Sequence, residues 1–116
     1  MSLLEKAKFL LRKHRIFPNK RLGQNFMIES SILQNAISYA SLAQDDVVLD
    51  IGTGLGFLTQ SLATECKRVL AIESDARLVK ILCEQLRNLS NIKIIHGVLL
   101  NFFNSFFRNY TIHSKK

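Results

Sequence analysis

The residues best suited to chemistry form a glycine-rich segment, Asp50-Ile51-Gly52-Thr53-Gly54-Leu55-Gly56. It follows a short apolar run and precedes a helical pattern, which is the setting that a nucleotide-binding loop requires. Glycine lets the backbone pass close to a ligand because no Cβ stands in the way, and a helix start presents free N–H groups. The segment therefore predicts a site for a nucleotide-like ligand.

A carboxylate is expected beside this loop. Glu73 ends the next apolar run, 21 residues after Gly52, and in a Rossmann-like sheet that position faces the ribose of the ligand. A carboxylate there accepts hydrogen bonds from both ribose hydroxyls.

The spacing of the glycines favours one ligand over others. A dinucleotide site needs G-x-G-x-x-G, but residue 57 is Phe, and the chain has no G-x-x-x-x-G-K-[ST] phosphate loop. The observed G-x-G-x-G suits S-adenosylmethionine, whose methionyl part has no pyrophosphate to cradle. A different nucleotide-binding α/β protein, or a tight turn without a ligand, is the alternative.

The elements that must position this site alternate along the chain. Three apolar, β-branched runs read as buried parallel strands: Val47–Ile51, Arg68–Glu73 and Ile92–Ile95. A helix over Phe57–Glu65 connects the first two. Between the second and third, a helix capped by Asp75 carries Leu78, Val79, Leu82 and Leu86 on its apolar side. The alternation predicts an α/β fold with a parallel sheet.

Two helices are expected ahead of the sheet. Ser2-Leu3-Leu4-Glu5 has the form of a capping box, and the helix that it starts must end before Pro18. A second helix is predicted over Ser31–Ala43, with Ser31 and Gln34 as its capping box.

Basic charge is concentrated near the N-terminus. The net charge is +7, and residues 1–22 hold seven of the 16 basic residues against a single acidic one, Glu5. Such asymmetry indicates a polyanionic partner, most often nucleic acid; a solvated helix face is the alternative. A mitochondrial presequence is disfavoured, because Glu5 falls in the first turn and serine is scarce.

We expect a cytoplasmic, monomeric protein without membrane association. No apolar run approaches the roughly 18 residues of a membrane-spanning helix. We interpret Cys66 and Cys83 as small core residues of a reducing compartment, since their separation fits neither a disulfide framework nor a metal site. No metal ligands are expected. An aromatic stripe from Phe102 to Tyr110 has helical spacing, and we expect it to pack on the sheet rather than on a membrane.

Three segments resemble the ribosomal RNA adenine dimethyltransferase family. Lys20-Arg21-Leu22-Gly23-Gln24-Asn25-Phe26-Met27 is similar to its N-terminal motif, which relatives that methylate 23S ribosomal RNA and mitochondrial transcription factor B share. Asp50–Gly56 is similar to its cofactor loop and Ile72–Asp75 to its ribose-binding strand end. The resemblance covers roughly residues 6–110, and the basic first helix looks more like that of archaeal members.

The resemblance implies a Rossmann-like S-adenosylmethionine-dependent methyltransferase fold, truncated after about three parallel strands and preceded by N-terminal helices. It divides the chain into a basic helix and N-terminal motif, residues 1–28, and a partial cofactor-binding domain, residues 29–116. It implies that Lys20 and Arg21 lie near RNA phosphates. The implied cofactor contacts are Gln24, Asn25 and the backbone of Met27 at the methionine end, Gly52 and Gly54 beneath it, and Glu73 on the ribose.

This sequence departs from the family pattern at two places, and these departures limit which roles of the family's residues can be assigned to this chain. Gly97-Val98 stands where the family usually has Gly-Asp. Val98 cannot accept the hydrogen bond from the adenine amino group of the cofactor, which weakens binding by about 0.5–1.5 kcal/mol. The family's catalytic motif, Asn-[Leu/Ile/Val]-Pro-[Tyr/Phe], is absent from residues 1–116, whose single proline is Pro18. No catalytic residue is therefore assigned.

We expect a fragment of an rRNA (adenine-N6,N6)-dimethyltransferase that acts in rRNA processing and ribosome biogenesis. Its predicted cofactor is S-adenosylmethionine, and its predicted partner is small-subunit rRNA or the pre-ribosomal subunit. The alternative is a non-catalytic pseudo-enzyme that binds S-adenosylmethionine or RNA.

Overall fold

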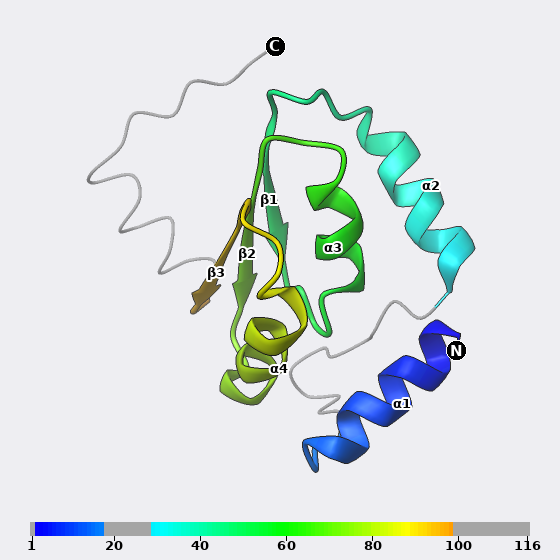
Figure 1. Ribbon diagram of the computed structural model, residues 1–116, viewed down its shortest axis with the longest axis vertical. Helices are drawn as coiled ribbons and strands as arrows, with labels where there is room; N and C mark the ends of the chain where they lie inside the picture. The colour runs from blue at the N-terminus through cyan, green and yellow to red at the C-terminus, as the bar shows by residue number, and fades with distance from the viewer. Residues whose placement is uncertain (1, 18–28, 99–116) are drawn as a thin grey trace.

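Three parallel strands form the sheet, in the order β1 (Val47–Ile51), β2 (Arg68–Glu73) and β3 (Ile92–His96) (Figure 1). The three predicted strands are confirmed, and β3 is one residue longer than expected. The register places Ile51 beside Ile72, and Glu73 beside His96. The carboxyl ends of all three strands therefore meet at one edge of the sheet.

The computed structural model describes residues 2–17 and 29–98 of the 116. The predicted aromatic stripe from Phe102 to Tyr110 lies outside these residues. Within the two described ranges, no helix is long and apolar enough to cross a membrane.

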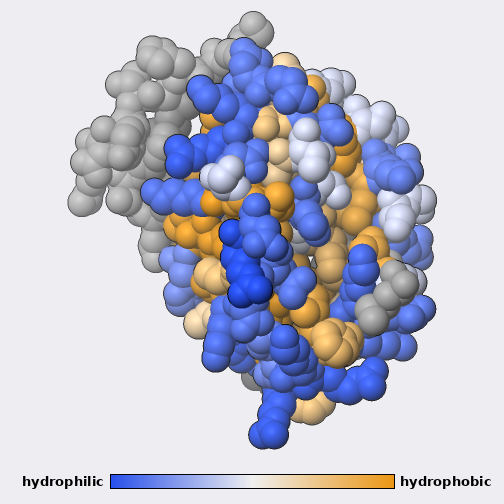
Figure 2. All heavy atoms as spheres, viewed as in Figure 1, coloured by the Kyte–Doolittle hydropathy of each residue, from blue (hydrophilic) through white to orange (hydrophobic). Residues whose placement is uncertain are grey.

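Two helices that connect the strands cover one face of the sheet. Leu62 and Ala63 of α3 (Phe57–Ala63) pack with Val69 of β2. The helix α4 (Ala76–Leu86) contacts β2 and β3. The predicted α/β fold is thus confirmed, although α3 ends two residues earlier than Glu65. Figure 2 shows hydrophilic side chains over α4 and the neighbouring α1, with apolar ones visible between the helices.

The Asp75 cap of α4 is also confirmed. Its carboxylate accepts a hydrogen bond from the backbone N–H of Arg77 at 2.9 Å. Leu78, Leu82 and Leu86 are buried as expected, and so is Ile81.

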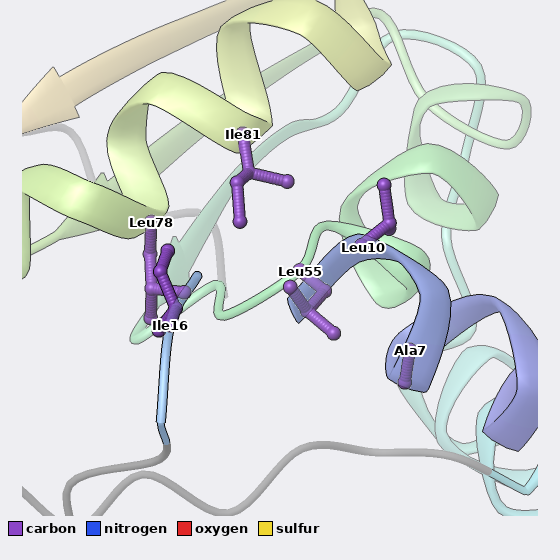
Figure 3. Packing of buried hydrophobic residues seen from close by; sticks show 6 residues of the cluster. All are labelled: Ala7, Leu10, Ile16, Leu55, Leu78 and Ile81. Atoms are coloured by element: carbon purple, nitrogen blue, oxygen red, sulfur yellow. The ribbon is translucent and has the colours of Figure 1, made fainter. Parts of the chain in front are cut away.

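The first helix, α1 (Leu3–Lys13), begins at the predicted Ser2 cap. Ser2 Oγ accepts a hydrogen bond from the Glu5 N–H at 3.1 Å, and lies 3.2 Å from Glu5 Oε1. Ala7 and Leu10 of α1, with Ile16 after it, pack against a cluster that includes Leu55 (Figure 3). Because Leu55 belongs to the glycine-rich segment and Leu78 and Ile81 of the same cluster belong to α4, α1 is fixed to both.

The second helix, α2 (Ser30–Ala40), differs from the expectation at both ends. Its N-cap is Glu29, with no side-chain cap hydrogen bond, so the predicted capping box of Ser31 and Gln34 is wrong. The helix starts before Ser31 and ends at Ala40, because Ser41 adopts a left-handed conformation with φ 47°. Of the residues in α2, only Leu33 is buried.

Two expectations of burial are wrong. In β1, Val47 is 58% and Ile51 is 50% exposed, because α3 and α4 cover only the face that carries Val48 and Asp50, and no other described element lies on the opposite face. Cys66 is buried as expected, but Cys83 is exposed, since the face of α4 that packs inward carries Leu78, Ile81 and Leu82.

Candidate functional site

The glycine loop, residues 52–56, leaves β1 at the edge where the strands end. Its three glycines have φ values of 70°, 60° and 84°, a left-handed region that other residues adopt at a cost. The N–H of Gly52 donates to Ile72 O at 2.8 Å, and the N–H of Gly56 donates to Thr53 O at 3.0 Å. These bonds hold the turn against the end of β2.

The two ends of the loop have different surroundings. A Cβ built on Gly52 meets no atom of residues 2–17 or 29–98 within 4 Å. A Cβ built on Gly56 lies 2.8 Å from Leu82 Cδ2 and 3.3 Å from Leu86 Cδ1. Gly56 therefore allows α3 to begin against α4, whereas Gly52 leaves its backbone open to a ligand.

Glu73 connects the glycine loop to the start of α4. Its Oε1 accepts a hydrogen bond from the Gly54 N–H at 2.9 Å, and its Oε2 accepts one from the Asp75 N–H at 2.9 Å. The residue is only 5% exposed. An ionised carboxylate offers about four acceptor positions, so about two remain after these bonds, enough for the two hydroxyls of a ribose.

A second carboxylate, Asp50, lies beneath the loop in β1. It is buried, and its Oδ2 accepts a hydrogen bond from Thr59 Oγ1 of α3 at 2.6 Å. Burial raises the pKa of Asp50, the negative charge of Glu73 raises it further, and the bond from Thr59 works against both. Asp50 and Thr59 thus join β1 to α3 directly behind the glycines.

The end of β3 completes the edge. The N–H of Gly97 donates to Glu73 O at 3.0 Å, and His96 Nε2 lies 3.1 Å from Ser74 O. Val98 follows and is 46% exposed. The structure therefore brings the ends of all three strands to one edge of the sheet, where β2 lies between the glycine loop and Val98.

Five predicted site residues lie outside the described residues: Gln24, Asn25, Met27, Lys20 and Arg21. Their predicted roles stay predictions. Among the described residues, no group of three or more His, Cys, Asp or Glu side chains could hold a metal ion.

The described residues fit a nucleoside-bearing cofactor. Gly52 leaves open space, Glu73 keeps acceptor capacity, and Thr53 Oγ1 is a buried hydroxyl with no hydrogen-bond partner in the described structure. A buried polar atom without a partner is uncommon and calls for a physical reason. A bound ligand at the loop supplies one.

Three contributors to the site were not identified from the sequence. The first two are Asp50 and Thr59. Asp50 belongs to the glycine-rich segment, but its buried hydrogen bond with Thr59 was not predicted, because the two residues are nine positions apart. Leu55 is 3% exposed and packs with Ala7 and Leu10 of α1. An apolar residue between two glycines was the signal that could have indicated this packing.

A separate hollow of about 570 Å³ lies between α2 and α3. Its polar lining includes Ser38, Ser61 and Thr64, and its apolar lining includes Leu33 and Ile37. None of these residues carries a pattern that predicts chemistry, so the hollow is a rival site on shape alone.

Comparison with known proteins gives a consistent answer. Residues 17–115 match the family model described as ribosomal RNA adenine dimethylase. A probable ribosomal RNA small subunit methyltransferase A from Pyrococcus abyssi is 44% identical over 89 residues, which are 77% of this chain and 33% of that protein.

Two solved structures share the fold. The 23S rRNA methyltransferase ErmE is 34% identical, with a TM-score of 0.63 over 66% of this chain and 31% of that chain. A dimethyladenosine transferase from Plasmodium falciparum is 25% identical, with a TM-score of 0.62 over 78% of this chain and 30% of that chain. The chain spans about a third of the length of the curated relatives that it matches.

Proposed function

The chain belongs to the ribosomal RNA adenine dimethylase family, and from this premise we propose that it is the S-adenosylmethionine-binding part of an rRNA adenine N6-dimethyltransferase. The observation that carries the proposal is the position of Glu73. This buried carboxylate bonds the Gly54 N–H and the Asp75 N–H, and it retains acceptor capacity at the edge where three parallel strands end. Ligands of open α/β sheets bind at this edge.

Each described site residue has a proposed task. Glu73 accepts hydrogen bonds from the ribose hydroxyls, while Gly52 and Gly54 let the cofactor lie on the loop backbone. Val98 lies against the adenine as an apolar neighbour and leaves its amino group without a bond from this side chain. Outside the described residues, Gln24, Asn25 and the backbone of Met27 are proposed to hold the methionine end.

The cofactor would supply a methyl group on a sulfonium that the amino group of a target adenine can attack. The described residues need no nucleophile for this transfer; their task is to bind and orient the donor, and such positioning lowers the barrier substantially. We assign no catalytic residue to the chain.

Small-subunit rRNA is the proposed acceptor, with Lys20 and Arg21 near its phosphates. The basic charge of residues 1–22 supports a polyanionic partner. The similarity to a probable ribosomal RNA small subunit methyltransferase A from Pyrococcus abyssi points in the same direction.

Isothermal titration calorimetry tests the cofactor proposal. We expect the purified chain to bind S-adenosylmethionine at one site and to give no binding heat with NAD. Tighter binding of NAD than of S-adenosylmethionine would favour a different nucleotide-binding protein and would reject the proposal.

A pair of matched variants sharpens this test. Glu73→Ala should weaken S-adenosylmethionine binding by about tenfold or more, because it removes a charged hydrogen-bond acceptor. Glu65→Ala removes an equal charge from the end of the α3 region and should bind like wild type. Circular dichroism of both variants verifies folding, and unchanged affinity in a folded Glu73→Ala chain would contradict the assignment of Glu73.

A further inference from the structure

The carboxyl end of α1 carries a hollow of about 590 Å³, lined by Lys8, Leu11, Arg12, Arg15, Ile16 and Phe17. Lys8 and Arg12 occupy positions i and i+4 of α1, so they share one side of the helix, and Arg15 follows just after the helix ends at Lys13. Leu11 and the buried Ile16 are the apolar part of the lining. Phe17 is 83% exposed, so an aromatic ring stands in solvent beside three cations.

The charges of this hollow are not neutralised by neighbours. Among residues 2–17 and 29–98, the ion pairs Lys13–Glu84, His14–Glu84 and Arg77–Asp75 include none of Lys8, Arg12 and Arg15. Glu84 Oε2 of α4 instead lies 4.0 Å from Lys13 Nζ and 3.1 Å from His14 Nε2. The two neighbouring basic residues are therefore held toward α4, whereas the other three have no acidic partner among the described residues.

The backbone at the end of α1 is held in an unusual conformation. Arg15 has φ 54°, its N–H donates to Arg12 O, and the Ile16 N–H donates to Leu11 O at 2.9 Å. Many helices end with this pair of hydrogen bonds, and the residue in the left-handed conformation is then usually glycine. An arginine there is strained, and strained residues persist where the surroundings fix them, often at functional sites.

The conformation fixes the hollow in place. Ile16 packs beside Leu78 of α4, and the same cluster includes Leu55 of the glycine loop (Figure 3). Arg15 and Phe17 flank Ile16 in the chain. The basic hollow is thus attached to the proposed cofactor site through one apolar cluster.

We propose that this hollow binds a single-stranded segment of RNA, with Lys8, Arg12 and Arg15 on phosphates and Phe17 stacked on a base. The proposal rests on the proposed function, since the RNA is the substrate of that same site. Cations that follow a phosphate backbone, combined with an exposed aromatic ring, are the means by which proteins hold single strands. One phenylalanine offers little area for a membrane, which needs a broad apolar face.

Fluorescence anisotropy with a fluorescein-labelled, mixed-sequence single-stranded RNA of about 10 nucleotides tests the proposal on the purified chain. Arg15→Gly is the informative variant, because glycine relieves the left-handed strain and should leave the fold intact or stabilise it. We expect weaker RNA binding, and a dependence of log affinity on log salt that is shallower by about 0.7, the value for one released counterion per phosphate on a single strand. Phe17→Ala should weaken binding about tenfold.

Lys67→Ala is the matched control. It removes one exposed positive charge before β2, at the opposite end of the sheet from the glycine loop, and should leave RNA affinity and salt dependence unchanged. Equal binding by wild type, Arg15→Gly and Lys67→Ala would overturn the proposal. Loss of binding to vesicles of anionic phospholipid in Arg15→Gly, with RNA binding unchanged, would overturn it in favour of a membrane surface.

The same samples titrated with S-adenosylmethionine separate this inference from the proposed function. Arg15→Gly should bind the cofactor like wild type. Cofactor binding with no effect of Arg15→Gly on RNA rejects the RNA surface alone. Absence of cofactor binding in wild type, with the expected RNA effects present, rejects the cofactor assignment and supports the RNA surface.

Discussion

The two ends of the glycine loop contain the same residue type in the same backbone region, yet they meet different surroundings. Gly52 has φ 70° and open space where a side chain would begin, whereas Gly56 has φ 84° and the side chains of Leu82 and Leu86 in that place. Between them, Leu55 packs against α1. The end of the loop at Gly56 is therefore part of the core, and the end at Gly52 is available to a ligand.

This difference separates two reasons for a glycine that look identical in a sequence. At Gly56 the missing Cβ lets two helices approach, so its loss acts on folding. At Gly52 the missing Cβ lets a ligand approach, so its loss acts chiefly on binding. Both substitutions share the cost of the left-handed conformation, which makes each the control for the other.

Gly56→Ala has the largest expected effect on stability. The added Cβ would lie 2.8 Å from Leu82 Cδ2, and Leu82 is fully buried with little room to shift. Overpacking costs about 1–3 kcal/mol and the left-handed alanine about 1–2 kcal/mol. Urea unfolding should therefore report a loss of about 2–5 kcal/mol, and a loss no larger than that of Gly52→Ala would show that the contact with α4 is unimportant.

Gly52→Ala has a smaller expected effect on folding and a larger one on ligand binding. No described residue opposes the added Cβ, so unfolding should report only the conformational cost of about 1–2 kcal/mol. Affinity for S-adenosylmethionine, measured by calorimetry on the folded variant, should fall by about tenfold or more because the methyl group occupies space proposed for the cofactor. Unchanged affinity would place the ligand elsewhere.

Asp50→Asn has the smallest expected effect and tests the support behind the loop. Burial raises the pKa of Asp50 in the folded chain, whereas the unfolded value is about 3.9. The folded state therefore binds more protons between the two values, and wild-type stability declines as pH rises through that interval. Asparagine does not titrate and can still accept the hydroxyl of Thr59, so the variant should equal wild type below about pH 3.9 and exceed it at pH 7.

Urea unfolding over this pH range measures the free energy of unfolding of Asp50→Asn and of wild type. The difference between the two removes the contributions of the other titrating groups, which both chains share. A variant less stable than wild type at pH 7 would mean that the charge of Asp50 is stabilising. Thr59→Val provides the complementary control, because it removes the hydroxyl that donates to the buried carboxylate at 2.6 Å. It should destabilise the chain at pH 7 by about 1–3 kcal/mol.

The sequence predicted the parts of the fold that depend on neighbouring residues. The Ser2 and Asp75 caps are confirmed because a cap joins residues two or three apart. The strands are confirmed because β-branched side chains fit the pleated, half-buried surface of a sheet. The glycine loop and Glu73 were placed together because parallel strands bring their carboxyl ends to one edge.

The parts that depend on distant partners were predicted less well. Burial of β1 requires an element on both faces, and exposure of Cys83 depends on which side of α4 packs inward. The ends of α2 were misplaced because serines before and inside a helix look alike in sequence. The bond from Thr59 to Asp50 joins separate elements, so no local pattern indicates it. The apolar Leu55 between two glycines indicates burial, but it does not indicate that α1 is the partner.

The most direct test of where the cofactor binds is a titration of ¹⁵N-labelled chain with S-adenosylmethionine, followed by amide chemical shifts. The account predicts the largest shifts at Gly52, Gly54, Glu73 and Gly97, where the three strands end, with little change in the hollow between α2 and α3. Shifts concentrated at Ser38, Ser61 and Thr64 of that hollow, or no shifts at all, would contradict it.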